Sequence, residues 1–251
     1  VIIRPAIDEA CKSALPIILT LETAPDFPGT NGTCFGVELP TGLVLVTAAH
    51  VVRDVEQTRV EVPIAFGDRH QELLPIAHID YLKPLAPDYE DACDVAVMVP
   101  TTRPATRGGH FKPISIERIA NIETMKSPQL YVVAGYPRCH PAGNAVDYDR
   151  RAIDFRLFHA IGTYEGKAEG MPGCHTLKLS TESVGGPQGL SGSPVFRVVF
   201  NRAGRDSYAL AGVVIRGNRE LVHFIGADLV AAMLHREQAS FFAPSPEVRP
   251  R

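Results

Sequence analysis

Short apolar runs separated by turn-forming residues recur along most of the chain. Glycine and proline, 21 of each, divide these runs from one another. The runs are rich in β-branched and aromatic side chains, and they are Ile17–Thr20, Thr33–Leu39, Leu43–Val46, Val60–Phe66, Val95–Val99, Leu130–Ala134, Thr176–Leu179, Val195–Phe200, Leu210–Ile215 and Leu221–Ile225. Many short strands with turn signals between them predict a sandwich or a barrel rather than alternating strand–helix units.

Only two segments carry a helical pattern. Asp228 can cap a closing helix over residues 228–236, whose apolar residues fall on one face. The opening segment Ile7–Leu15 is the second, and Pro16 would end it. Residues 237–251 run through Ala-Pro-Ser-Pro into charged residues, so we expect them to form a flexible tail.

The composition is that of an ordinary globular protein. Of the 251 residues, 45% are hydrophobic and 21% are charged, so one large domain or two small ones can bury a sizeable core. The formal net charge is -3 and no long run of Lys or Arg occurs, so we expect no nucleic-acid partner and no membrane partner. No stretch of about 18 apolar residues occurs either. The polar stretch Thr101–Thr124 fits a connection between two halves.

The five cysteines are expected to be buried thiols that form no disulfide. Their odd number and irregular spacing favour a reducing compartment and predict a cytoplasmic protein. Since the chain begins at Val1, an exported protein whose signal peptide has been removed is the alternative. No CxxC pair or Cys/His cluster occurs, so neither a metal nor another cofactor is expected.

Three segments carry residues of catalytic type. Leu43–His50 is an apolar strand that passes into small residues and ends on a histidine. Asp91–Val99 places Asp94 directly before a strand of buried character. Gly186–Phe196 is a glycine-rich turn with Ser191 at its centre, followed by a strand.

Together these side chains can form a nucleophilic catalyst. A serine hydroxyl is a poor nucleophile until a base removes its proton, and imidazole is the side chain suited to that task. A carboxylate on the other ring nitrogen fixes the tautomer and stabilises the imidazolium as it forms. Small residues around the serine allow the Gly189 and Ser191 amides to stabilise an oxyanion, which is typically worth about 3–4 kcal/mol per donor.

The three segments resemble the motifs of trypsin-like, chymotrypsin-fold serine proteases. Residues 47–50 read Thr-Ala-Ala-His, residues 189–194 read Gly-Leu-Ser-Gly-Ser-Pro, and the chain order His, Asp, Ser is that of the chymotrypsin type. Residues 31–37 and 131–137 are similar to strands of bacterial relatives, the latter to HtrA-type and glutamyl-endopeptidase-type enzymes. The similarity covers roughly residues 15–236.

The resemblance implies an all-β fold of two six-stranded antiparallel β-barrels with a short C-terminal helix. A single protease domain would occupy residues 1–236. Its N-terminal barrel would lie at about 15–110, its C-terminal barrel at about 125–227 and its closing helix at about 228–236.

The resemblance also implies a serine endopeptidase that works through an acyl-enzyme intermediate. His50, Asp94 and Ser191 would form its catalytic triad, and the amides of Gly189 and Ser191 its oxyanion hole. Such an enzyme takes a protein or peptide substrate and needs no cofactor.

Two departures from the animal enzymes point to the bacterial branch. Leu190 replaces the aspartate that pairs with a newly cut N-terminus in pancreatic-type enzymes, so activation by that ion pair is not expected. Val51 replaces the cysteine of the histidine-loop disulfide. Ser193 replaces a glycine, as in some bacterial enzymes.

Neighbouring residues compete for two of the catalytic roles. Asp88 and Asp91 lie in the same loop as Asp94, but only Asp94 stands at the entrance of a strand. Ser193 competes with Ser191, but the proline that follows Ser193 matches the family frame in which Ser191 attacks.

Substrate-binding residues are expected in the second half of the chain. By the family pattern, Ile215, Arg216 and Gly217 form an edge to which a peptide adds as an antiparallel strand. Gln188 and His223 complete the predicted substrate-binding set. No acid occupies the family's pocket-floor position, so a Lys/Arg preference is not supported. Small, apolar and acidic P1 residues remain open, and His223 and Arg216 favour an acidic one.

Two further hypotheses stay open beside a plain endopeptidase. A degenerate protease could serve as a peptide- or protein-binding module. Alternatively, a competent enzyme could be regulated by a partner protein or ligand that orders the glycine-rich loop Gly185–Gly189.

Overall fold

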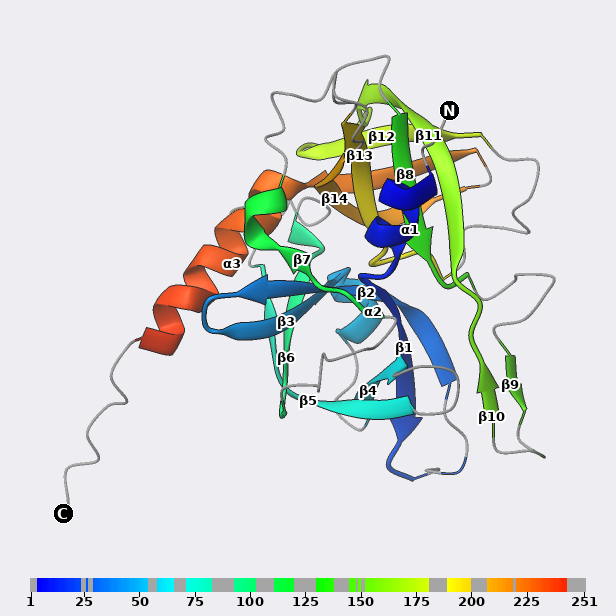
Figure 1. Ribbon diagram of the computed structural model, residues 1–251, viewed down its shortest axis with the longest axis vertical. Helices are drawn as coiled ribbons and strands as arrows, with labels where there is room; N and C mark the ends of the chain where they lie inside the picture. The colour runs from blue at the N-terminus through cyan, green and yellow to red at the C-terminus, as the bar shows by residue number, and fades with distance from the viewer. Residues whose placement is uncertain are drawn as a thin grey trace.

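Two β-barrels, one above the other in Figure 1, hold most of the strands of the chain. The computed structural model describes residues 4–23, 26, 29–53, 58–65, 71–82, 93–102, 111–119, 130–137, 145–147, 149, 152–180, 189–199, 207–218 and 220–242. The predicted fold class is confirmed: the chain is mostly β, with two closed six-stranded antiparallel barrels and a short C-terminal helix.

The first barrel is built from the N-terminal strands. Its members are β1 (Ala14–Leu21), β2 (Gly29–Leu39), β3 (Gly42–Thr47), β4 (Thr58–Ala65), β5 (Gln71–Tyr81) and β6 (Ala96–Pro100). They follow the order β1-β4-β5-β6-β3-β2, and the pairing of β1 with β2 closes the circle. A short strand, β7 (Ile114–Ser115), pairs in parallel with the outer side of β2.

The second barrel is built from the C-terminal strands. Its members are β8 (Leu130–Gly135), β11 (Phe158–Lys167), β12 (Cys174–Leu179), β13 (Pro194–Val199), β14 (Ser207–Gly217) and β15 (Leu221–Gly226). They close in the order β11-β12-β15-β14-β13-β8. A separate two-stranded sheet, β9 (Ala145–Asp147) with β10 (Ala152–Asp154), precedes β11.

The N-terminal helix is shorter than the sequence pattern predicted. Helix α1 (Arg4–Cys11) ends before Ala14, where β1 begins, so the predicted end at Leu15 is wrong and Pro16 lies within a strand. The register explains why a proline is tolerated there. Pro16 faces Thr33 of β2, whereas the pairing of β1 with β4 starts only at Ile18. Burial of the flanking apolar residues in the barrel outweighs the local helical pattern.

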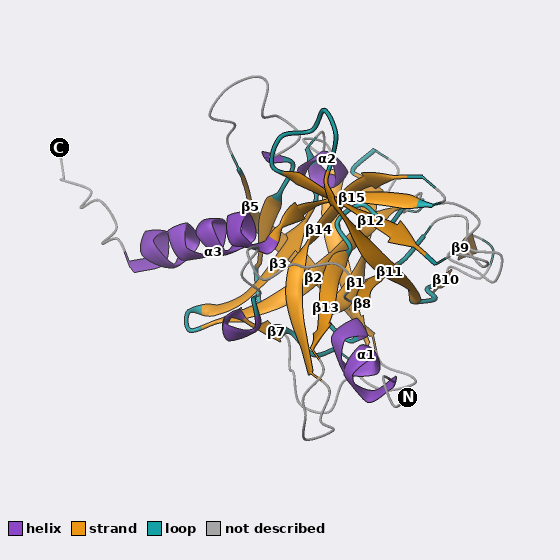
Figure 2. Ribbon diagram, turned by 90° about the horizontal axis from the view of Figure 1, so that it is seen from above, coloured by secondary structure: helices purple, strands orange, loops and turns teal. Residues whose placement is uncertain are grey.

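The C-terminal helix is longer than predicted. Helix α3 (Ala227–Phe242) continues past residue 236 and extends away from the barrels (Figure 2). Its added turns contain good helix formers, Glu, Gln and Ala, and Pro244 cannot continue a helix. Near its start, Ala227, Val230 and Leu234 are fully buried.

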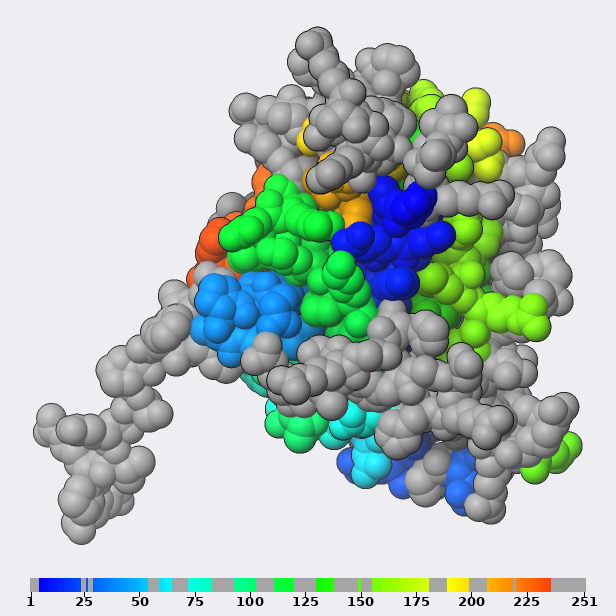
Figure 3. Space-filling model, viewed as in Figure 1, coloured from blue at the N-terminus to red at the C-terminus, as the bar shows by residue number. Residues whose placement is uncertain are grey.

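The segment between the barrels fastens the N-terminal helix. The polar stretch 101–124 contains β7 and a 3₁₀ turn, η3 (Ile116–Arg118), among its described residues. The carboxylate of Glu9 on α1 accepts from Lys112 Nζ at 2.8 Å and from Arg118 Nη1 at 3.3 Å. Figure 3 shows α1 in blue directly beside this segment in green.

The apolar core is continuous between the two barrels. One cluster joins residues of β2, β3 and β6 to Val132, Phe196 and Val213 of the second barrel. A second cluster fills the C-terminal barrel and includes Leu190, which is fully buried. The turn that carries Ser191 is therefore anchored in the second core by the residue directly before it.

Candidate active site

His50 lies on a single helical turn at the end of a barrel strand. Strand β3 ends at Thr47, and α2 (Ala49–Val52) begins two residues later. Ala48 and Ala49 at this junction are fully buried. The Ala49 amide donates to the Asp94 carbonyl at 3.1 Å. This bond ties the start of α2 to the residue that pairs with the histidine.

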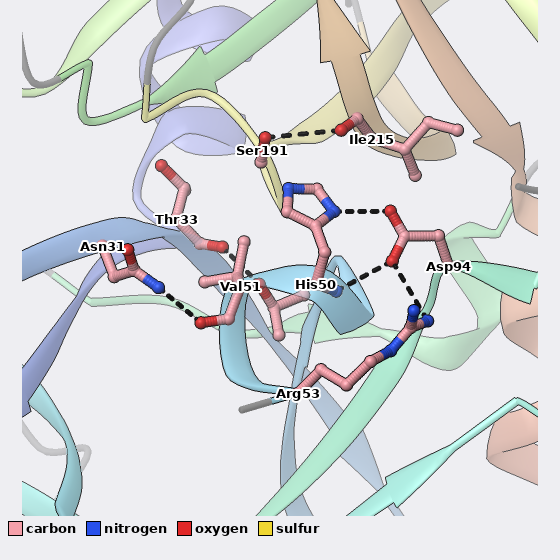
Figure 4. Close-up of polar contacts among 9 residues, drawn as sticks. Asn31, Thr33, His50, Val51, Arg53, Asp94, Ser191 and Ile215 are labelled. Carbon is pink, nitrogen blue, oxygen red and sulfur yellow. Dashed lines mark hydrogen bonds and ion pairs between the residues drawn. The ribbon is translucent and has the colours of Figure 1, made fainter. Parts of the chain in front are cut away.

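The carboxylate of Asp94 binds His50 twice. Its Oδ2 lies 2.5 Å from His50 Nδ1, and its Oδ1 accepts the His50 backbone N–H at 2.8 Å (Figure 4). The Asp94 side chain is only 13% exposed, against 45% for the His50 side chain. Because a carboxylate accepts, the ring proton belongs on Nδ1, which leaves Nε2 as an acceptor.

A third group approaches the same carboxylate. Arg53 follows α2, and its Nη2 lies 3.8 Å from Asp94 Oδ1. The Arg53 side chain is half exposed, so solvent screens this ion pair and its effect on stability is small.

Ser191 lies on a tight turn between the two barrels. Gly189 has φ +93° and Gly192 has φ +84°, both in the region that favours glycine. The turn is closed by the Ser193 amide, which donates to the Leu190 carbonyl at 2.9 Å. A Cβ atom at Gly192 would overlap the Thr33 carbonyl oxygen and the Thr47 hydroxyl. Only glycine therefore lets the turn approach the first barrel this closely.

The Ser191 hydroxyl is turned toward β14. Its Oγ donates to the Ile215 carbonyl at 3.4 Å, and no bond to His50 is among those found between described residues. In Figure 4 the His50 ring lies between Ser191 and Asp94. The three predicted triad residues are thus brought to one place, although Ser191 and His50 are not bonded to each other.

The two predicted oxyanion amides have no backbone acceptor within the described part of the chain. Neither the Gly189 nor the Ser191 N–H donates to another described residue. The carbonyls on either side of Leu190 are bound, however: Gly189 O accepts from the Thr33 hydroxyl and Ser191 O accepts from the Thr33 amide, each at 3.0 Å. Gln188 lies outside the described residues.

The structure distinguishes Ser191 from Ser193, its competitor for the role of nucleophile. Ser193 is fully buried, and its hydroxyl has no hydrogen-bond partner among the described residues, whereas Ser191 is partly exposed. A buried hydroxyl cannot reach a substrate. Asp88 and Asp91, the rivals of Asp94, lie outside the described residues.

The predicted substrate-binding residues lie on two adjacent strands. Ile215, Arg216 and Gly217 end β14, and Arg216 faces His223 of β15 in the strand register. His223 Nδ1 lies 3.1 Å from Thr176 Oγ1. Burial lowers the pKa of His223, and the nearby Arg216 guanidinium lowers it further. The imidazole is therefore neutral near pH 7, and Arg216 carries the charge at this place.

The described cysteines are buried and form no disulfide, as predicted for them. These are Cys11, Cys34, Cys93 and Cys174, while Cys139 lies outside the described residues. Burial, reinforced by the charge of Asp94, raises the pKa of Cys174 to about 11, so its thiol stays protonated.

No group of three or more metal-ligating side chains occurs among the described residues. No helix in that part of the chain is long and apolar enough to cross a membrane.

Three residues around the site had not been singled out from the sequence. Thr33 contacts the serine turn, Asn31 Nδ2 donates to the Val51 carbonyl of α2 at 2.6 Å, and Arg53 approaches Asp94. The only signal was that Asn31 and Thr33 open a segment similar to a strand of bacterial proteases.

Comparison with solved structures supports the fold. The chain is similar to a thermostable serine protease, AL20, from an extremophilic microorganism, with a TM-score of 0.58 and 13% sequence identity. The match covers 93% of this chain and 99% of that protein. No family model matches the sequence, and no curated protein matches it. At this identity the match shows the chymotrypsin-like fold and carries no residue roles.

Proposed function

We propose that the protein is a serine endopeptidase with Ser191 as nucleophile, His50 as general base and Asp94 as the residue that orients the base. The observation that carries the proposal is the pair of hydrogen bonds between the Asp94 carboxylate and His50, one to the ring nitrogen at 2.5 Å and one to the backbone amide at 2.8 Å. A histidine held in this way presents its second nitrogen on the side away from the carboxylate, where the serine turn lies.

The proposed reaction begins with a rotation of the Ser191 side chain. Its hydroxyl leaves the Ile215 carbonyl, to which it is bound at a long 3.4 Å, and donates to His50 Nε2. His50 removes the proton as the oxygen attacks the peptide carbonyl, which forms the tetrahedral intermediate. The imidazolium, stabilised by Asp94, then gives the proton to the leaving amine, and the acyl-enzyme remains on Ser191.

The second half of the reaction repeats these steps with water. His50 takes a proton from the water that attacks the ester, and returns it to the Ser191 oxygen as the acid product leaves. The amides of Gly189 and Ser191 would stabilise both oxyanions, since neither donates to another described residue.

For substrate recognition we propose an extended peptide beside the end of β14. Arg216 and Gly217 are exposed there, whereas Ile215 is buried. The charge of Arg216 next to the neutral, partly buried His223 favours an acidic P1 side chain. We also propose that the protein is related to bacterial proteases of the HtrA or glutamyl-endopeptidase type. A partner protein would control its activity.

One observation favours the binding-module hypothesis as the second candidate. The Ser191 hydroxyl is bonded to Ile215 and not to His50, as in a protein whose serine is not activated. The two candidates differ in one property, the cleavage of a peptide bond.

Peptide cleavage in matched variants separates the two candidates. The wild-type chain, Ser191→Ala and Ser193→Ala are incubated with a peptide library that includes acidic, small and apolar residues at each position. We expect the wild type and Ser193→Ala to cleave, and Ser191→Ala to lose activity by about 10⁴-fold or more. Cleavage that survives in Ser191→Ala would exclude the assigned nucleophile. Peptide binding without cleavage in the wild type would support the binding module.

A further inference from the structure

One side chain of the first barrel holds the turn that carries the proposed nucleophile. Thr33 lies on β2 and is fully buried. It contacts the turn through both its backbone and its side chain: its amide donates to the Ser191 carbonyl and its hydroxyl to the Gly189 carbonyl, each at 3.0 Å. In the view of Figure 4, Thr33 is drawn between Asn31 and Ser191.

The orientation of the Thr33 hydroxyl is fixed by a second bond. The Tyr136 amide, directly after β8, donates to Thr33 Oγ1 at 2.9 Å. A hydroxyl has a single proton to donate, so with Tyr136 as its donor the Thr33 proton is left for Gly189. The side chain therefore joins both barrels to the serine turn at one point.

The backbone of Thr33 is itself held from the other side. Its carbonyl accepts from the Thr47 hydroxyl at 2.7 Å, and Thr47 ends the strand that leads into the His50 helix. A Cβ at Gly192 would overlap this same carbonyl, so the turn and Thr33 are in direct van der Waals contact. Thr33 thus connects the histidine-bearing segment directly to the serine-bearing turn.

We propose that Thr33 is a positioning residue for the hydrolysis, a role that rests on the proposed endopeptidase function. Its hydroxyl fixes the Gly189–Leu190 peptide, which contains the Gly189 carbonyl and lies between the Gly189 and Ser191 amides, the two proposed oxyanion donors. Gly189 has φ +93°, and a glycine backbone rotates easily between conformations. A bond from another residue is therefore needed to hold the backbone of Gly189 in this conformation. With Thr33 in place, the Gly189 and Ser191 amides converge on one point without rearrangement during the reaction.

The consequence is specific to the transition state. Loss of the hydroxyl leaves Gly189 O without this partner and frees the Gly189–Leu190 peptide to rotate, which changes the relative orientation of the Gly189 and Ser191 amides on either side of it. The substrate edge at β14 is untouched. We therefore expect kcat to fall with little change in KM.

The test compares Thr33→Val, which removes the hydroxyl at nearly constant volume, with Thr33→Ser, which keeps it. Ser13→Ala is the matched control, because Ser13 is also a fully buried hydroxyl that donates to a carbonyl, Ala10 O at 2.8 Å, but lies outside the site. We expect kcat to fall about tenfold or more in Thr33→Val, and to stay within about threefold of wild type in the other two. An unchanged kcat in Thr33→Val, with an active wild type, overturns the positioning role and leaves the proposed function intact.

A spectroscopic measurement makes the test independent of activity. In the full-length chain, the amide NMR resonances of Gly189 and Leu190 should shift in Thr33→Val far more than in Thr33→Ser or Ser13→Ala. Equal shifts overturn the inference even if the wild type proves inactive, in which case the proposed function fails separately. If Thr33→Val does not fold, the exchange of the Thr33 hydroxyl proton with water is measured in the wild type instead. Slow exchange supports the bond to Gly189, and rapid exchange overturns it.

Discussion

Asp94 binds both the ring and the backbone amide of His50, with Oδ2 2.5 Å from Nδ1 and Oδ1 2.8 Å from the amide nitrogen. The pair therefore fixes the position of the α2 turn as well as the orientation of the imidazole. One carboxylate holds the proposed base in place and selects its tautomer.

Replacement of Asp94 by Asn tests this relationship. The amide can donate to Nδ1 and would then place the ring proton on Nε2, the nitrogen that must accept from Ser191. We expect kcat/KM for a peptide substrate to fall by about 10⁴-fold, with the fold retained. Asp8→Asn, on the exposed face of α1, is the control and should leave kcat/KM unchanged. Full activity in Asp94→Asn would show that this carboxylate does not orient the base.

The approach of the serine turn to the first barrel depends on Gly192. Alanine there combines a φ of +84° with overlap against Thr33 and Thr47, whereas at Gly170, φ +70°, a Cβ meets nothing within 4 Å. Gly170→Ala should cost only the backbone strain, about 1–2 kcal/mol of unfolding free energy. Gly192→Ala should lower the unfolding free energy, measured by urea denaturation, clearly more than Gly170→Ala does. It should also abolish peptide cleavage. Equal losses of stability in the two variants would contradict the packing described for this turn.

Leu190 anchors the turn that carries Ser191, the proposed nucleophile, through apolar packing. The side chain is fully buried in the core of the second barrel. Leu190→Ala should lower the unfolding free energy by about 2–5 kcal/mol, because it leaves a cavity. Leu190→Met, which nearly conserves the volume, should lower it by less than about 1.5 kcal/mol. A cost for Leu190→Ala within the error of the measurement would mean that the turn is held elsewhere.

His175 gives the second barrel a pH-dependent stability. It is buried on β12, and its Nδ1 lies 2.8 Å from the Tyr164 hydroxyl. Burial lowers the pKa of His175; the Asp228 carboxylate opposes this effect, and Lys167 adds to it. The unfolded chain, with a histidine pKa of about 6.5, then binds a proton that the folded chain does not. Stability should therefore fall as the pH drops through about 6.5.

Chemical denaturation at a series of pH values measures this effect. The unfolding free energy of the wild type should decrease between pH 7.5 and 5.5 by more than that of His175→Asn, which does not titrate. The same pH dependence in both proteins would exclude His175 as its source.

Arg216 provides the test of the proposed substrate preference. Arg216→Gln should lower kcat/KM for peptides with an acidic P1 residue by about tenfold relative to a neutral P1, because a charge–charge contact is lost. Arg59→Gln, an exposed arginine on β4 paired with Glu61, is the control and should leave the ratio unchanged. An unchanged ratio in Arg216→Gln would mean that this side chain does not read the P1 residue.

The sequence predicts most of the strands and the segments that carry His50, Asp94 and Ser191, because both depend on local patterns. Apolar runs bounded by glycine and proline mark β3 and β6, and small residues beside His50 and Ser191 mark close packing. The register of β1 against β2 and β4 was not readable. It depends on partners distant in sequence, and it places Pro16 in a strand where the local pattern indicated the end of a helix.

The supporting residues of the site were unreadable for the same reason. Thr33 is one threonine in a β-branched strand, and its sequence context resembles that of any barrel residue. Its role follows from four hydrogen bonds to Ser191, Gly189, Tyr136 and Thr47, which only the folded barrels bring together. Arg53 likewise becomes relevant only when α2 places it beside Asp94.

The most direct test of the account is the site at which a fluorophosphonate reacts with the protein, since this reagent phosphonylates a serine that a base has activated. Intact-mass and peptide mass spectrometry should find one adduct per chain, on Ser191. The adduct should be absent in Ser191→Ala, strongly reduced in His50→Ala and unchanged in Ser193→Ala. An adduct on another residue, or equal labelling of the wild type and His50→Ala, would contradict the assignment of Ser191 and His50 as nucleophile and base.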